Sequence, residues 1–261
     1  MERNDSRFVH VVASVYIYPN LHPLTTQYPV ELINIRHHYT TVRILSDVSL
    51  AFAPECITAI LGKSGSGKST LLQIINGMIR PDQGEVKIFG KPIDYGNIQA
   101  MRLQIGYVVQ QVGLFPHLTI YENIALLGKI AHRPTDVIRK RVEQLMNMVQ
   151  LPLLHLDKYP YQLSGGEQQR AGLCRAMLLE PPVLLMDEPF ASLDYETKHS
   201  IYDHLIDIQK SEPRTILLVS HDWEEAQILA DRFVLLEHGK IKTTGDKATI
   251  EQTKYNYTSR K

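Results

Sequence analysis

The 261-residue sequence has only two cysteines, no long apolar run and no net charge, and each absence excludes a class of protein. Cys56 and Cys174 are too few and too far apart for a disulfide framework or a thiolate metal site, so we expect reduced, partly buried thiols. No segment approaches the ~18 apolar residues that a membrane-crossing helix needs. The 28 basic and 28 acidic residues cancel, which argues against a general electrostatic grip on nucleic acid or anionic lipid but leaves room for a local patch.

The remaining composition is that of an ordinary globular chain. Hydrophobic residues make up 44% and charged residues 21%, without repeats or low-complexity tracts. The length allows one or two compact domains with a sizeable core.

The most informative stretch is 62–70, GKSGSGKST, which matches the phosphate-loop pattern G-x-x-x-x-G-K-[ST] at every specified position. An apolar, β-branched run at 57–61 precedes it, and an amphipathic segment at 71–76 follows it. The loop therefore joins a buried strand to a helix. This context favours a nucleotide site over the alternative, a Gly/Ser-rich surface loop.

Each residue type in this loop suits a nucleoside triphosphate. Successive backbone N–H groups at a helix N-terminus can meet closely spaced phosphate oxygens, and glycines keep that approach open and allow positive φ. Lys68 supplies a cation for the β and γ phosphates, Ser69 a hydroxyl for Mg²⁺, and Thr70 a phosphate contact. We expect the whole loop to bind ATP, that is Gly62, Lys63, Ser64, Gly65, Ser66, Gly67, Lys68, Ser69 and Thr70.

Tyr39 is a candidate for contact with the nucleotide base. It stands ~20 residues before the phosphate loop, between strands expected at 30–36 and 45–52. An aromatic ring can stack on adenine, since every base offers a π-face. The alternative is a strand-end tyrosine that packs on the sheet. We favour stacking because a nucleotide loop follows.

Four polar residues follow apolar strands, and we expect them to face the phosphate loop because ligands gather at the carboxyl ends of parallel strands. Asp187 is expected to hold Mg²⁺ through water, and Glu188 to orient or deprotonate the attacking water. His221 could bond the γ-phosphate or the water. Gln110 could coordinate Mg²⁺ and sense the γ-phosphate. The alternatives are a solvent-facing acid pair and a structural histidine.

The stretch 163–170, LSGGEQQR, is not explained by a single nucleotide site. Ser164 can cap the following helix with Glu167 completing a capping box, and the simpler interpretation stops there. Gly165 and Gly166, however, expose a second backbone phosphate site at a helix N-terminus. Because 121–178 is mostly helical and predicts a separate lobe, this site is expected to reach the nucleotide of a partner in a two-fold dimer.

Together these motifs resemble the nucleotide-binding subunit of an ATP-binding-cassette (ABC) transporter over roughly 31–245. In that resemblance, 62–70 matches the Walker A loop, 163–170 the family signature and 183–188 the Walker B strand with the catalytic glutamate. The D-loop is matched by 191–194, the Q-loop by Gln110, the switch histidine by His221 and the A-loop aromatic by Tyr39.

The resemblance implies an α/β fold: a P-loop NTPase, RecA-like core with an antiparallel β subdomain and an inserted helical subdomain at about 91–178. Residues 1–30 are expected to form a peripheral arm and 246–261 a polar tail that frays. The implied activity is ATP hydrolysis, with Glu188, His221 and Gln110 catalytic and with Ser69, Gln110 and Asp187 at the metal. Two copies of the chain would clamp two ATP molecules.

The resemblance also implies partners. These are transmembrane permease subunits, received at the apolar loop 113–118, and an extracytoplasmic solute-binding protein, with this chain peripheral on the cytoplasmic face of the plasma membrane. No nucleic-acid partner is expected. The stretch 105–123 resembles bacterial importers, and Gln110-Gln111 with 113–116 is most like osmoprotectant importers, followed by amino-acid importers.

Two features depart from the osmoprotectant pattern. Such ATPases often carry a long regulatory C-terminal extension, whereas this sequence ends ~20 residues after the expected hairpin at 233–243. Glu55-Cys56 also stands where the family usually has Gly-Glu. The alternatives to an importer are an exporter or lipid-trafficking ATPase and a cassette ATPase outside transport.

Overall fold

A computed structural model describes residues 28–110 and 113–258, with no side-chain placement for 255–258. Most of the arm expected at 1–30, and Gln111 of the importer-like Gln-Gln pair, lie outside the described residues. Within the described part, no helix is long and apolar enough to cross a bilayer.

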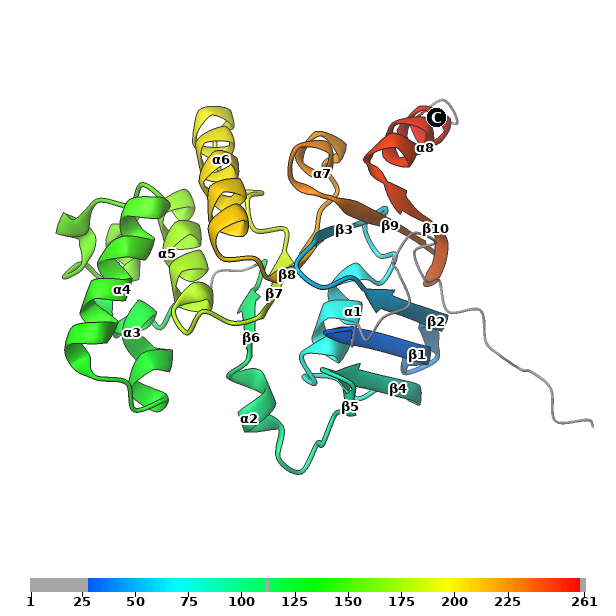
Figure 1. The fold of residues 1–261 in the computed structure, drawn as a ribbon, viewed down its shortest axis with the longest axis horizontal. Helices are drawn as coiled ribbons and strands as arrows, with labels where there is room; N and C mark the ends of the chain where they lie inside the picture. Colours follow the sequence, from blue (N-terminus) through cyan, green and yellow to red (C-terminus); the bar gives the residue numbers. More distant parts are fainter. Residues whose placement is uncertain (1–27, 111–112, 259–261) are drawn as a thin grey trace, which may run out of the picture.

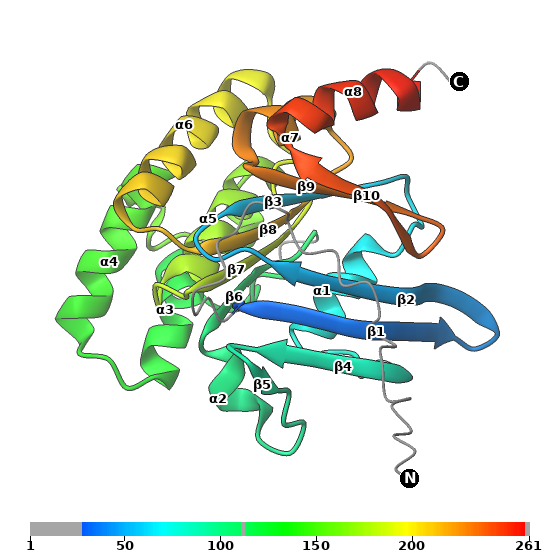
Figure 2. The same cartoon turned by 45° about the vertical axis from the view of Figure 1, so that its right-hand side comes forward.

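Two sheets form the centre of the molecule (Figures 1 and 2). The smaller sheet has the order β2-β1-β4-β5 and the larger sheet the order β10-β9-β3-β8-β7-β6. The strands of the smaller sheet are β1 (Val30–Tyr39), β2 (Val42–Phe52), β4 (Gln83–Ile88) and β5 (Lys91–Pro92). Those of the larger sheet are β3 (Ile57–Leu61), β6 (Ile105–Val108), β7 (Val183–Asp187), β8 (Thr215–Val219), β9 (Arg232–Glu237) and β10 (Lys240–Asp246).

The larger sheet is parallel except for β10, which pairs antiparallel with β9 as a hairpin. Every residue of β3, β7 and β8 is buried, as expected for parallel strands covered on both faces. Alternate residues serve the two faces. Ile60 and Leu185 pack towards α1 (Lys68–Ile75) and the smaller sheet, and Leu61 and Met186 pack towards the other helices.

Of the described helices beyond α1, Figure 1 shows α3, α4 and α5 at the left, α6, α7 and α8 along the top, and α2 at the bottom. They are α2 (Ile98–Arg102), α3 (Ile120–Ile130), α4 (Thr135–Met148), α5 (Gly165–Met177), α6 (Tyr195–Ser211), α7 (Trp223–Leu229) and α8 (Lys247–Thr258), with 3₁₀ turns at Leu153–His155 and Pro160–Gln162. Helices α3, α4 and α5 pack on one another through residues such as Ile124, Val142 and Leu173. We call α3 to α5 the helical lobe.

The range 91–178 is not helical throughout. Residues 91–92 form β5 of the smaller sheet, and 105–108 form β6 at the edge of the larger sheet. Continuous helical structure starts only at Ile120. Gly106 lets β6 lie directly against the lobe, because a Cβ there would stand 2.4 Å from the carbonyl oxygen of Ala176 in α5.

Within the tail expected at 246–261, residues 247–258 form helix α8. Asp246 caps this helix by accepting hydrogen bonds from the backbone N–H (3.1 Å) and hydroxyl (2.9 Å) of Thr249. Ile250 is buried in the main core. The Lys254 ammonium also donates to the side-chain oxygen of Gln227 in α7 at 3.3 Å. Residues 259–261 lie outside the described part.

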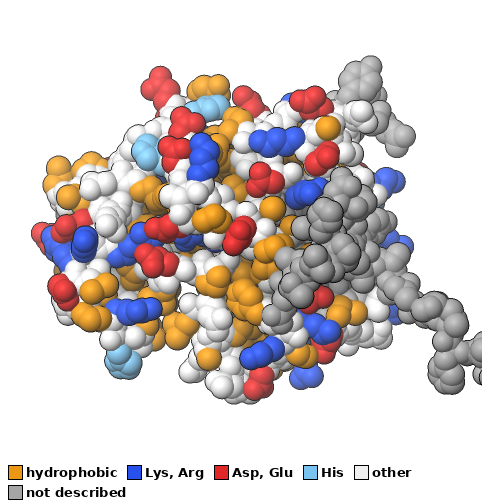
Figure 3. Space-filling view, viewed as in Figure 1, with side chains coloured by type: hydrophobic (Ala, Val, Ile, Leu, Met, Phe, Trp, Pro, Cys, Tyr) orange, Lys and Arg blue, Asp and Glu red, His pale blue; other side chains and the backbone are white. Residues whose placement is uncertain are grey.

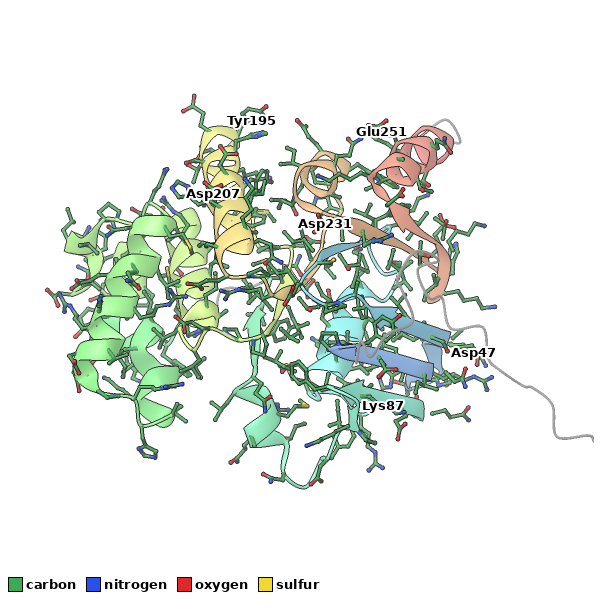
Figure 4. All side chains as sticks on the ribbon, viewed as in Figure 1. Asp47, Lys87, Tyr195, Asp207, Asp231 and Glu251 are labelled. Carbon is green, nitrogen blue, oxygen red and sulfur yellow. The ribbon has the colours of Figure 1, made fainter. Side chains whose placement is uncertain are left out.

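The first residue of β3, the strand that precedes the phosphate loop, is hydrogen-bonded to a residue much later in the chain. Asp231, labelled in Figure 4 between α7 and β9, accepts a hydrogen bond from the backbone N–H of Ile57 at 2.9 Å. This contact lies where β3 and β9 begin to pair. The parallel pairing of β3 with β8 and of β8 with β7 brings the carboxyl ends of these three strands to one edge. There Asp187 lies opposite Val219, and Ile60 pairs with the same residue.

Candidate active site

The phosphate loop has a backbone that only glycine fits at two positions. Gly62 has φ +155°, and a Cβ there would lie 2.2 Å from the carbonyl oxygen of Leu236. Gly67 has φ +103°, and its Cβ would lie 2.8 Å from the side chain of Leu45. The loop is therefore pressed against β9 and β2, with its backbone close to neighbouring strands.

The N-terminus of α1 is left open for a ligand. Its capping residue is Gly67, and no side chain caps the helix. The first N–H groups of a helix need partners, and an anion can supply them. The hydroxyl of Ser66 is buried and has no hydrogen-bond partner among the described residues. These features fit a bound phosphate chain.

Lys68 lies inside the loop with only 6% of its surface exposed. Its ammonium group donates hydrogen bonds to the carbonyl oxygens of Gly62 (2.8 Å) and Lys63 (3.0 Å). Burial lowers the pKa of Lys68, and the nearby carboxylates of Glu188 and Asp187 oppose that effect. The cation is thus held where the sequence predicted a phosphate contact.

Asp187 and Ser69 form the second part of the site. The Ser69 hydroxyl donates to the Asp187 carboxylate at 3.0 Å, and Asp187 is 4% exposed. Burial raises the pKa of Asp187 and the neighbouring Glu188 adds to this, while the Ser69 hydrogen bond and Lys68 oppose it. A buried carboxylate beside a hydroxyl is a set of hard oxygen donors, which fits Mg²⁺.

Glu188 is held by two other strand-end residues from the sequence prediction. One carboxylate oxygen accepts a hydrogen bond from the Gln110 amide at 3.1 Å, and the other lies 3.3 Å from Nδ1 of His221. The Glu188 backbone is left-handed, φ +47°, and its N–H donates to Val219 at 3.0 Å. The end of β7 therefore turns sharply and directs the carboxylate between Gln110 and His221.

Gln169 is a residue of this site that sequence reasoning missed. It lies in α5, is 2% exposed, and its amide donates to the carbonyl oxygen of Glu188 at 3.1 Å. Its own oxygen accepts from the backbone N–H of Ser192 at 3.2 Å. Gln169 thereby links the helical lobe to the turn that carries Glu188. Gln169 lies within the predicted signature stretch 163–170, but no sequence pattern there indicated this role.

The N-terminus of α5 at 164–166, the second phosphate site expected from the sequence, has the predicted capping structure. Ser164 caps α5, and the capping box is complete: the Glu167 N–H donates to the Ser164 hydroxyl at 3.3 Å, and the Ser164 N–H donates back to the carboxylate at 2.8 Å. The Ser164 N–H and hydroxyl, which each donate to the Glu167 carboxylate at 2.8 Å, lower the pKa of Glu167. A Cβ on Gly165 would meet nothing within 4 Å, whereas one on Gly166 would lie 3.0 Å from Leu193.

Not every predicted residue is joined to the phosphate loop. No hydrogen bond found among the described residues joins 164–166 to residues 64–70 of the same chain. Tyr39 ends β1 with 45% of its surface exposed and touches the ring of His37. The charged side chains on the face in Figure 3 are interspersed by sign rather than gathered into one patch.

A glycine-lined phosphate loop, a buried lysine, a Ser–Asp pair and a strand-end glutamate define a P-loop nucleotide-binding protein. Comparison with known proteins gives the family. The family model described as "ABC transporter" matches residues 45–191. The glycine betaine uptake system ATP-binding protein YehX of Escherichia coli (strain K12) is 36% identical over 85% of this chain and 72% of YehX. The chain therefore belongs to the ABC transporter family.

Other relatives are similar over a smaller part of their length. The choline transport ATP-binding protein OpuBA of Bacillus subtilis (strain 168) is 41% identical over 78% of this chain and 53% of OpuBA. This chain thus spans about half the length of that relative. The sulfate/thiosulfate import ATP-binding protein CysA of Synechococcus elongatus is 38% identical over 85% of this chain and 63% of CysA.

Solved structures agree with the fold. The dimeric structure of MJ0796, a bacterial ABC transporter cassette, has a TM-score of 0.80 and 31% identity, covering 84% of this chain and 98% of that one. A dimeric post-hydrolysis state of the same cassette with ADP and Pi has a TM-score of 0.79. The predicted fold class, an α/β ABC ATPase fold, is confirmed.

Proposed function

We propose that this chain binds and hydrolyses ATP to power a membrane importer for a small polar solute. The observation that supports this best is the convergence at one sheet edge. Glu188 is held by Gln110 and His221 directly beside the Ser69–Asp187 pair and the phosphate loop.

The side chains divide the chemistry among them. Lys68 and the loop backbone bind and orient the phosphates, and Ser69, Asp187 and Gln110 would hold Mg²⁺. When bound, Mg²⁺ supplies charge neutralisation on the phosphate oxygens. The Glu188 carboxylate orients a water and accepts its proton, and its two hydrogen-bonding neighbours keep it in one orientation. His221 stands where it can contact the γ-phosphate or that water.

We infer that the site is completed by a second copy of the chain. The N-terminus of α5 at Ser164 is exposed, a Cβ on Gly165 would meet nothing within 4 Å, and backbone N–H groups are available at Gly165 and Gly166. In a two-fold dimer, these groups would meet the phosphates bound by the partner. Both MJ0796 structures are titled as dimers, which supports this arrangement.

The proposed partners are transmembrane permease subunits and an extracytoplasmic solute-binding protein, with this chain peripheral on the cytoplasmic face. The names of YehX and OpuBA favour a quaternary ammonium osmoprotectant as solute, and CysA makes sulfate the competing outcome. Calorimetry on the binding protein encoded beside this chain separates these, with glycine betaine, choline, amino acids and sulfate as ligands. Tight binding of a quaternary ammonium supports the osmoprotectant assignment, and tight binding of sulfate overturns it.

The ATPase proposal is tested on the transporter reconstituted with its permease subunits. Glu188→Gln should lower ATP turnover by about 10²–10⁴-fold, the usual contribution of a general base. Glu196→Gln, an exposed acid at the start of α6, is the matched control and should keep wild-type turnover. Turnover in Glu188→Gln equal to that of the control would overturn the proposal.

A further inference from the structure

The end of β1 carries a buried histidine that the proposed ATP chemistry does not use. The His37 side chain is 8% exposed, and neither ring nitrogen makes a hydrogen bond to another described residue. Burying a polar ring without hydrogen bonds costs free energy, so the position of His37 calls for an explanation.

His37 contacts Tyr39, the proposed base-stacking residue. The ring centroids are 5.0 Å apart and the ring planes are nearly perpendicular, at 87°. Edge-to-face packing of this kind restricts how a ring can turn. Tyr39 is 45% exposed at a strand end, and His37 supplies the ring contact found for it among the described residues.

Asp82 lies close to His37 and is hydrogen-bonded to its neighbour His38. One carboxylate oxygen of Asp82 lies 3.4 Å from Nδ1 of His37 and 3.1 Å from Nδ1 of His38. The same oxygen accepts the backbone N–H of His38 at 2.7 Å, and the Asp82 N–H donates to the carbonyl oxygen of Arg36 at 2.9 Å. The turn before β4 is thereby fastened to the end of β1.

The cluster of His37, His38 and Asp82 lies at the end of β1, which pairs with β2, the strand that contacts the phosphate loop. His37 stands opposite Leu45 in the β1–β2 register. The Leu45 side chain is the group that a Cβ on Gly67 would meet at 2.8 Å. Leu45 therefore lies between the position of His37 and the phosphate loop, and Tyr39 follows His37 by two residues on β1.

We propose that His37, buried beside Asp82, is a positioning residue that orients the Tyr39 ring to receive the nucleotide base. This inference rests on the proposed ATP-binding function. A ring already oriented loses less freedom when a base stacks on it, so the base binds more tightly. His37 then contributes to the affinity for a nucleoside triphosphate and contributes nothing to the affinity for inorganic tripolyphosphate, which has no base.

The experiment is calorimetry of ATP and of inorganic tripolyphosphate binding to the full chain. His37→Ala should weaken ATP binding about 2- to 10-fold, the range for one aromatic contact, and leave tripolyphosphate binding within about twofold. His37→Phe keeps an aromatic ring and should restore most of the ATP affinity. His132→Ala, an exposed histidine after α3, is the control and should change neither.

A double-mutant cycle with Tyr39→Ala shows whether His37 acts through Tyr39. In the Tyr39→Ala background, His37→Ala should cause no further loss of ATP affinity. An equal loss for both ligands, an additive loss with Tyr39→Ala, or unchanged ATP binding in His37→Ala would overturn the inference and leave the proposed function standing. Failure of the wild-type chain to bind ATP would overturn both.

Discussion

Replacing Gly67 by alanine tests the packing of the phosphate loop against β2. Gly67 has φ +103°, and a Cβ there would lie 2.8 Å from the Leu45 side chain and 3.1 Å from the carbonyl oxygen of Ile44. A left-handed backbone costs a residue with a Cβ ~1–2 kcal/mol. Overpacking against a backbone oxygen, which rotamer changes cannot relieve, adds about 1–2 kcal/mol. We expect Gly67→Ala to lower the free energy of unfolding by roughly 2–4 kcal/mol.

Thermal unfolding followed by circular dichroism measures this loss. For a chain of this size, each kcal/mol corresponds to ~2–4 °C, so the melting temperature should fall by roughly 4–16 °C. Gly165→Ala is the matched control, because a Cβ there meets nothing within 4 Å and the backbone is not left-handed. It should melt within about 2 °C of wild type, since an exposed site costs little. If Gly67→Ala melts together with the control, the described fit of loop to strand is incorrect.

Two further substitutions test the rest of the framework. Gly106→Ala should lower the free energy of unfolding by about 1–3 kcal/mol, because the new Cβ would stand 2.4 Å from the Ala176 carbonyl oxygen; a denaturation midpoint equal to wild type would contradict this. Glu225 is buried and accepts the Tyr202 hydroxyl at 3.0 Å, and burial raises its pKa. A carboxyl group whose pKa is higher in the folded than in the unfolded state stabilises the folded state fully at pH values below its unfolded-state pKa. This stabilisation is lost as the pH rises through its folded-state pKa. Glu225→Gln should therefore melt above wild type at pH 7–8, with the difference shrinking towards pH 4; a constant difference across that range would refute the assignment.

The fold was predictable where burial leaves a pattern in the sequence. Strands β3, β7 and β8 are buried at every position, so each is a continuous apolar run ended by a glycine or a polar residue. Helix α8 was not predictable, because its described contacts with the body, such as the burial of Ile250 and the hydrogen bond from Lys254 to Gln227, are isolated. Isolated contacts of this kind produce no periodicity.

The site was predictable for side chains that follow buried strands, and Asp187, Glu188 and His221 all lie at the expected edge. Gln169 was not, because its role depends on a hydrogen bond from a helix to the backbone of a distant turn. The cluster of His37 and Asp82 was missed for the same reason, since 45 positions separate two residues that the β1–β4 pairing brings together. Contacts between side chains of distant segments leave no spacing rule in the sequence.

The most direct test of the central claim is the molar mass of Glu188→Gln in solution with saturating ATP and Mg²⁺, measured by light scattering. This substitution removes the proton acceptor and leaves both phosphate-binding surfaces intact, so ATP should hold two copies together. The account predicts a dimer with ATP that is lost when Ser164→Arg is added to block the N-terminus of α5. A monomer at saturating ATP, or a dimer that Ser164→Arg leaves unchanged, would contradict the claim that 164–166 of one copy completes the phosphate site of the other.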